Sequence, residues 1–136
     1  MLNSQQIDTY SALADLLIPD AGGMPSATQA HVHSEWINVA LGYRPDLMDH
    51  FLRAINACQG KDASEAVETL NREDTQAFDA LGVLTSGAYF LNPEVKAKLG
   101  YPGQLPVPAQ EDTETYLDML ENVVDRGAVY RASMDR

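Results

Sequence analysis

Three side chains near residue 33 are of types that bind metal ions. His31, His33 and Glu35 alternate along the sequence, and imidazole and carboxylate groups are ordinary zinc ligands. On a helix His31 and Glu35 share a face, one turn apart, whereas His33 points away from them. Two ligands on one helix do not make a site, so we expect surface histidines and no metal centre. The alternative is a metal-binding module that adds His50 and acidic residues near the C-terminus.

An acidic run near the C-terminus is a second candidate for chemistry. It consists of Glu111, Asp112, Glu114, Asp118, Glu121 and Asp125, with no basic residue before Arg126. Carboxylate pairs perform acid–base catalysis where an apolar pocket separates their pKa values. This run instead fits the solvated face of a helix, and its first members suit the N-terminal end of the helix dipole.

The one cysteine gives no indication of catalysis. Cys58 lies on an apolar stripe with Phe51 and Ile55, which is typical of a small buried side chain. The sequence also contains no phosphate-binding glycine loop, nucleophile elbow, EF-hand loop or Cys-x-x-Cys pair. We therefore expect no catalytic residue and no cofactor or metal bound by this chain.

Large apolar residues also occur where helical packing cannot bury all of them. Tyr89, Phe90 and Leu91 are consecutive, and a helix buries only some of three adjacent side chains. Further apolar residues decorate a proline-rich connector over 101–108, and Tyr130 lies beside Arg131 in the tail. Tyrosine and arginine outside a core are typical anchors of protein interfaces. Packing of the connector on its own helices is an equally open alternative.

Composition restricts the function further. The chain has 136 residues, 20 acids against 9 bases and a net charge of −11, so binding to nucleic acid or to an anionic membrane surface is disfavoured. No basic segment or arginine pair precedes the first apolar stretch, and no apolar run approaches the roughly 20 residues of a membrane span. We expect a cytoplasmic protein, or a periplasmic one only if a partner's signal carries it.

The spacing of apolar residues predicts helices that position these side chains. Ser4 is the expected N-cap of the first helix, which ends before Pro19. Further helices are predicted over 26–41, 45–58, 62–70, 73–91, 94–99 and from Thr113 to Gly127. The result is an all-α fold of five or six helices in a single compact domain, with a Pro/Gly-rich connector before a C-terminal helix.

Part of the fifth predicted helix is ambiguous. Residues 83–91 are rich in β-formers, so a strand is the alternative there, but the chain offers no alternating partner segment. Gly82 and Gly87 lie inside the same helix, where they indicate either a close contact between helices or a poorer helix.

Two segments resemble a known family. Residues 92–103, Asn-Pro-Glu-Val-Lys-Ala-Lys-Leu-Gly-Tyr-Pro-Gly, resemble a signature of the gluconate 2-dehydrogenase subunit 3 family. Residues 13–19, Leu-Ala-Asp-Leu-Leu-Ile-Pro, resemble its opening motif, and a Gly/Pro loop and a small-residue helix start at 26–30 follow in the same order. The resemblance covers about residues 10–105 and leaves the part from Glu111 uncovered. The twin-arginine signal that family members often carry is also missing from this chain.

The resemblance implies a small non-catalytic subunit. Family members accompany a large FAD-dependent oxidoreductase of the glucose-methanol-choline (GMC) type, which oxidises an alcohol or sugar hydroxyl. On this basis we expect a family-like body over 1–110, a C-terminal helix and tail over 111–136, and FAD in the partner only. The expected partner-binding residues are Tyr89, Phe90, Gly100, Tyr101, Pro102, Gly103, Leu105, Tyr130 and Arg131. The rival hypotheses are the metal-binding module and a helical adaptor or regulator with an unrelated partner.

Overall fold

The computed structural model of the protein describes residues 2–106 and 113–127. Their fold is all-α, as the sequence predicts. In chain order the elements are α1 (Ser4–Leu17), a π-helix η1 (Val32–Trp36), α2 (Ile37–Tyr43), a 3₁₀ helix η2 (Pro45–Leu47), α3 (Met48–Cys58), α4 (Ala63–Glu73), α5 (Thr75–Leu91), α6 (Pro93–Lys98) and α7 (Thr113–Arg126). The described residues thus contain seven α-helices, one for each of the seven helical segments predicted, whereas the expected total of five or six was too low.

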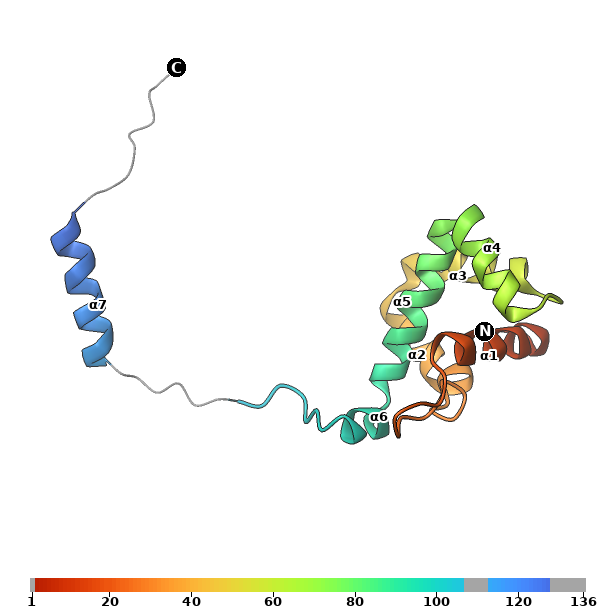
Figure 1. Cartoon of the computed structure of the whole chain (residues 1–136), viewed down its shortest axis with the longest axis horizontal. Helices are drawn as coiled ribbons and strands as arrows, with labels where there is room; N and C mark the ends of the chain where they lie inside the picture. Colours follow the sequence, from red (N-terminus) through yellow and green to blue (C-terminus); the bar gives the residue numbers. More distant parts are fainter. Residues whose placement is uncertain (1, 107–112, 128–136) are drawn as a thin grey trace, which may run out of the picture. The chain divides into compact units, whose positions relative to one another are not determined.

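The chain divides into two compact units, residues 1–103 and 104–136, and each is described by itself. We call the first unit, which contains α1 to α6, the body. Its central helix is α5, which packs against α2, α3 and α4 (Figure 1). The buried residues of α5 recur at helical spacing and are Ala77, Ala80, Leu81, Leu84, Thr85, Ala88 and Tyr89.

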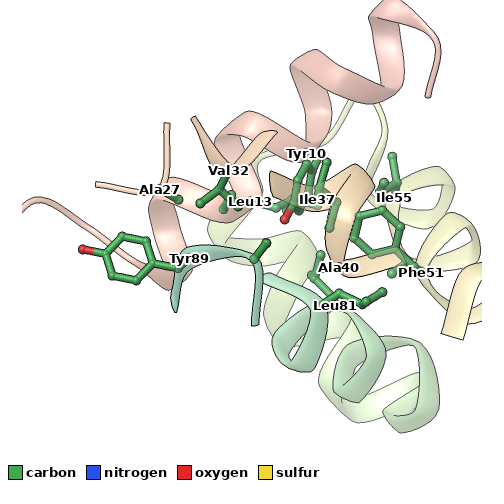
Figure 2. Close-up of a cluster of buried hydrophobic side chains, with 14 of the residues drawn as sticks. Tyr10, Leu13, Ala27, Val32, Ile37, Ala40, Phe51, Ile55, Leu81 and Tyr89 are labelled. Carbon is green, nitrogen blue, oxygen red and sulfur yellow. The ribbon is translucent and has the colours of Figure 1, made fainter. Parts of the chain in front are cut away.

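Two aromatic rings lie at the centre of the core. Tyr10 of α1 and Phe51 of α3 are fully buried and meet edge to face, with 5.0 Å between ring centroids (Figure 2). The Tyr10 hydroxyl is hydrogen-bonded to Oγ1 of Thr85 in α5 at 3.1 Å, so the buried polar atoms are paired. Burial raises the pKa of the Tyr10 hydroxyl, which keeps it neutral. Cys58 is also buried, as its apolar stripe predicts, and burial raises the pKa of its thiol.

The first helix begins one residue earlier than predicted. Its N-cap is Asn3 and not Ser4, because the Asn3 side chain accepts a hydrogen bond from the Gln6 amide at 2.9 Å. The Gln6 side chain accepts one from the Asn3 amide at 3.0 Å in return. This capping box satisfies two N–H groups that the start of a helix leaves unpaired.

The helix predicted over 26–41 is wrong in its first half. Ser26 and Gln29 do form a capping box, with the Gln29 amide donating to Ser26 Oγ and the Ser26 amide donating to Gln29 Oε1. Only one turn follows, because His31 takes a left-handed backbone conformation with a φ of 56°. The chain then forms η1, and α2 begins after it.

Residues 83–91 are helical, so the alternative of a strand is wrong. Gly82 and Gly87 of this helix do not mark a close contact, because a Cβ atom at either position would meet no atom within 4 Å. The other interpretation remains, in which each glycine costs about 1 kcal/mol of helix stability relative to alanine.

The second unit contributes α7, which ends where Gly127 adopts a left-handed conformation with a φ of 69° (Figure 1). The Gly127 amide donates to the carbonyl of Val124 at 3.0 Å. No residue of α7 is buried. Among the described residues of the whole chain, no helix combines the length and the apolar character needed to span a membrane.

Candidate functional site

The end of α5 divides adjacent aromatic residues between the core and the surface. Tyr89 is 4% exposed, and its hydroxyl donates to the carbonyl of Pro25 at 2.7 Å. Phe90 is 52% exposed, because successive helical side chains are about 100° apart. In Figure 2 the Tyr89 ring lies at one end of the drawn cluster, with its hydroxyl directed away from the other labelled side chains. Tyr89 is therefore a core residue, which corrects its expected place among surface contacts, while Phe90 remains a predicted contact.

Asn92 joins three segments of the body. Its side-chain oxygen accepts from the Glu94 amide at 2.8 Å, so it caps α6 as predicted, with Pro93 in the first helical position. Its side-chain nitrogen donates to the carbonyl of Ala30 at 3.0 Å. The Ala30 carbonyl thus accepts a hydrogen bond from a side chain. This pairing is consistent with a helix that ends after the single turn started by Ser26. Since Asn92 is 4% exposed, both bonds are shielded from water and fix the start of α6 against the preceding loop.

The turn after α6 fixes the position of Tyr101. Gly100 has a φ of 68°, and its amide donates to the carbonyl of Ala97 at 3.0 Å. The Tyr101 amide donates to the carbonyl of Lys96, also at 3.0 Å. These two bonds form a Schellman motif, in which glycine supplies the left-handed residue. Gly103, with a φ of 88°, turns the backbone again, so both glycines have the turning role that the sequence predicts.

Three large apolar side chains are exposed along this segment. They are Phe90, Leu99 and Tyr101, each 52% to 55% exposed, and we call them the α6 surface. The helix beneath them is anchored by Val95, which is fully buried. The segment is also close to neutral, since residues 89–106 contain one acid and two lysines in a chain of net charge −11. Exposed apolar area on a fixed backbone is suited to binding another protein and offers no group for acid–base chemistry.

The sequence did not lead us to single out Asp15, which is hydrogen-bonded to Thr28 in the loop before η1. Its carboxylate accepts from the Thr28 amide at 2.8 Å and from the Thr28 hydroxyl at 2.6 Å. Partial burial raises the pKa of Asp15, but the hydrogen bonds from Thr28, with smaller contributions from Ser26 and His33, together lower it by more, so the pKa lies below its usual value. The signal was present in the sequence, because Asp15 is the acid of the Leu-Ala-Asp motif. Asp15 of residues 13–19 and Asn92 of residues 92–103 thus both bond the loop at residues 25–30, and Tyr89, which precedes the second segment, bonds it as well.

An apolar groove lies between α2 and α5. Its volume is ≈ 230 Å³, and it is lined by Ala40, Tyr43, Arg44, Val83, Leu84, Gly87 and Leu91. Tyr43 is 72% exposed at its edge. The guanidinium of Arg44 is paired with Asp46 at 2.7 Å, which leaves the groove with little free charge.

The remaining predicted contacts lie outside the body or at its end. Pro102 is exposed in the connector. Leu105 is 63% exposed and belongs to the second unit. Tyr130 and Arg131 lie outside the described residues.

The histidines do not assemble a metal site in the described part of the chain. His31 is exposed and its left-handed backbone places it outside a helix, so the predicted shared face with Glu35 does not exist. His50 Nδ1 is 3.0 Å from an Arg53 nitrogen, and Arg53 is also bonded to Asp74. Within residues 2–106 and 113–127, no three His, Cys, Asp or Glu side chains are grouped closely enough to hold a metal ion.

Comparison with known proteins gives no match: no protein-family model fits the chain, and no curated protein or solved structure is significantly similar to it. The resemblance of residues 13–19 and 92–103 to a family therefore stays an expectation from the sequence alone.

Proposed function

We propose that the chain is a non-catalytic docking subunit that binds and stabilises a large FAD-dependent alcohol or sugar oxidoreductase of the GMC type. The observation that carries the proposal is the α6 surface. Leu99 and Tyr101 are more than half exposed within the family-like signature at residues 92–103, and Phe90, two residues before it, is exposed to the same degree. Large apolar side chains that are exposed on a fixed backbone are suited to anchor a protein interface.

The proposed action is to hold a segment of the large subunit in its folded arrangement. Docking to a surface already fixed by Asn92 and the Gly100 turn loses little conformational entropy in this chain. A partner that binds only the folded state shifts the folding equilibrium of the large subunit toward that state. FAD and all chemistry belong to the large subunit, and shaping of its substrate entrance is a further proposed role.

The test is to look for a large FAD-binding reading frame beside the gene for this chain and to co-express the two proteins, scored by the yield of soluble, flavin-loaded large subunit. Wild-type chain should raise that yield. Tyr101→Ala and Phe90→Ser should weaken the complex, each by about tenfold or more if the residue is an anchor. Val39→Ser is the matched control, because Val39 is a 38% exposed apolar residue on α2 and lies outside both family-like segments. An equally soluble, flavin-loaded and active large subunit without this chain would contradict the proposal.

An adaptor with an unrelated partner is the second candidate, and the same α6 surface favours it. The two differ in what the chain binds. Purification from its source with flavin absorbance as the readout distinguishes them, since the adaptor hypothesis predicts a partner without FAD.

A further inference from the structure

The groove between α2 and α5 continues into a second hollow. This hollow has a volume of ≈ 240 Å³ and lies between α5 and the segment from η2 to α3, where Leu47 and His50 line it. Arg44 and Val83 line both hollows, so the two join along α5. We call the joined hollows the α5 cleft. Every residue that lines it belongs to the body.

The α5 cleft is polar at one end and apolar at the other. Its α5 side is one stripe of residues at intervals of three, four and four, in the order Gln76, Asp79, Val83 and Gly87. At about 1.5 Å per residue, Asp79 and Gly87 are about 12 Å apart along the helix. A Cβ atom at Gly87 would meet no atom within 4 Å, so the apolar end is open over this residue. The cleft therefore has room for an extended molecule with two unlike ends.

Asp79 supplies a free negative charge at the polar end. The guanidinium of Arg44 is paired with Asp46 at 2.7 Å. The other cation near this end, Arg53, is paired with Asp74. Asp79 is exposed and forms no ion pair or hydrogen bond with any side chain in the part of the chain that the structure describes. The polar end can therefore accept a cation without breaking an existing ion pair.

We propose that the α5 cleft binds a primary amine that carries an aliphatic chain. The ammonium group donates hydrogen bonds to the Asp79 carboxylate and to the side-chain oxygen of Gln76, both of which are acceptors. The aliphatic chain lies over Val83 and Gly87 toward Leu91, where its burial removes apolar area from water. This site does not depend on the docking function proposed above, which uses the α6 surface.

An amphiphile with an anionic head group is a poorer ligand for the same cleft. Asp79 repels it, and Arg44 is already paired with Asp46. The net charge of −11 on the chain adds to the repulsion. The charge of the cleft therefore selects the amine.

Isothermal titration calorimetry of the full chain with n-butylamine, n-hexylamine and n-octylamine tests the proposal. Affinity should rise with chain length, by up to about fourfold for each methylene group that the cleft covers. The alcohol n-octanol has the same chain without the charge, and it should bind at least about tenfold more weakly than n-octylamine. Absence of saturable n-octylamine binding would overturn the proposal, as would equal affinities for n-octylamine and n-octanol.

Substitution of Asp79 tests the polar end. Asp79→Asn should weaken n-octylamine binding by about tenfold or more, because a hydrogen bond to a charged group is lost. Glu68→Gln is the matched control, since Glu68 is an exposed carboxylate of α4 that does not line the cleft. The control removes the same unit of charge and should bind as wild type. Equal losses in the two variants would mean that the whole negative chain attracts the amine, and the proposal would fail.

Substitution of Gly87 tests the apolar end. Gly87→Leu places a side chain where the aliphatic chain lies and displaces at least two methylene groups, so binding should weaken by about tenfold or more. Gly82→Leu is the matched control, because Gly82 lies in the same helix outside the cleft and is equally open at its Cβ position. Circular dichroism checks that both variants fold. Unchanged binding in Gly87→Leu, or an equal loss in Gly82→Leu, would overturn the placement of the amine in the α5 cleft.

Discussion

Helices α5 and α7 are both long and rich in apolar residues, yet only α5 is covered within its own unit. α5 buries seven of its 17 residues in the body, whereas α7 buries none of its 14. Their charge differs accordingly, since α5 contains one charged residue and α7 contains four acids and an arginine. α5 is a helix whose cover belongs to its own unit, and α7 is patterned for a cover on one side and water on the other.

This difference predicts that stability and binding depend on different parts of the chain. Side chains in the body determine how firmly the chain folds, and exposed side chains of α7 should affect only what it binds. Substitutions of the same kind in the body and in α7 test whether stability and binding depend on different regions. Each variant of the body then has a matched variant in α7.

The largest expected difference is in apolar truncation. Phe51→Ala removes a fully buried ring that packs on Tyr10, and it should lower the free energy of unfolding by about 3–5 kcal/mol. Leu120→Ala in α7 should change it by less than about 0.5 kcal/mol, as for an exposed site. Urea denaturation followed by circular dichroism measures both. A comparable loss for the two variants would contradict the separation.

Asparagine gives the next comparison. Asn92→Ala removes the cap of α6 and leaves the Ala30 carbonyl without its partner, so we expect a loss of about 2–3 kcal/mol. Asn122 donates to the carbonyl of Asp118 on an exposed helix, and Asn122→Ala should cost under about 0.5 kcal/mol. The same denaturation experiment applies, and near-equal values would show that the Asn92 bonds contribute little.

Asn92 also shows how far the sequence could predict the structure. Its role as a cap follows from Asn-Pro before a short helix, and the all-α fold follows from apolar spacing with Pro and Gly at the ends. Its bond to Ala30 joins residues 62 apart in sequence, and no local pattern signals such a contact. Without knowledge of that contact, the sequence predicts a helix over 26–41, which is longer than the single turn that follows Ser26 in the structure. For the same reason the sequence could not tell which of Tyr89 and Phe90 faces the core, since that depends on where the loop at Pro25 lies.

Carboxylates provide a smaller contrast, and it depends on pH. Asp15→Ala removes two hydrogen bonds from Thr28 and should cost about 1–2 kcal/mol at pH 7. The pKa of Asp15 is lower in the folded protein than in the unfolded chain, so its contribution is complete above the unfolded value of about 4. The contribution is lost as the pH falls through the folded pKa. Denaturation at pH 7 and pH 3 should therefore show the cost of Asp15→Ala shrinking in acid. Asp118→Ala in α7 is the control and should change the free energy of unfolding little at either pH. If Asp15→Ala lowers the free energy of unfolding equally at pH 7 and pH 3, Thr28 does not stabilise the charged form of Asp15.

Glycine gives the smallest effects, and they should have opposite signs. Gly87→Ala adds a methyl group where no atom lies within 4 Å, in the interior of α5, so it should stabilise the body by about 0.5–1 kcal/mol. Gly100→Ala forces a Cβ atom into a left-handed conformation and should destabilise it by about 1 kcal/mol. Gly127→Ala meets the same strain at the end of α7, but unfolding of the body should not change, because α7 belongs to the other unit. Thermal midpoints of the three variants measure the signs directly. A lower midpoint for Gly127→Ala would mean that α7 supports the body, and the separation between folding and docking would then fail.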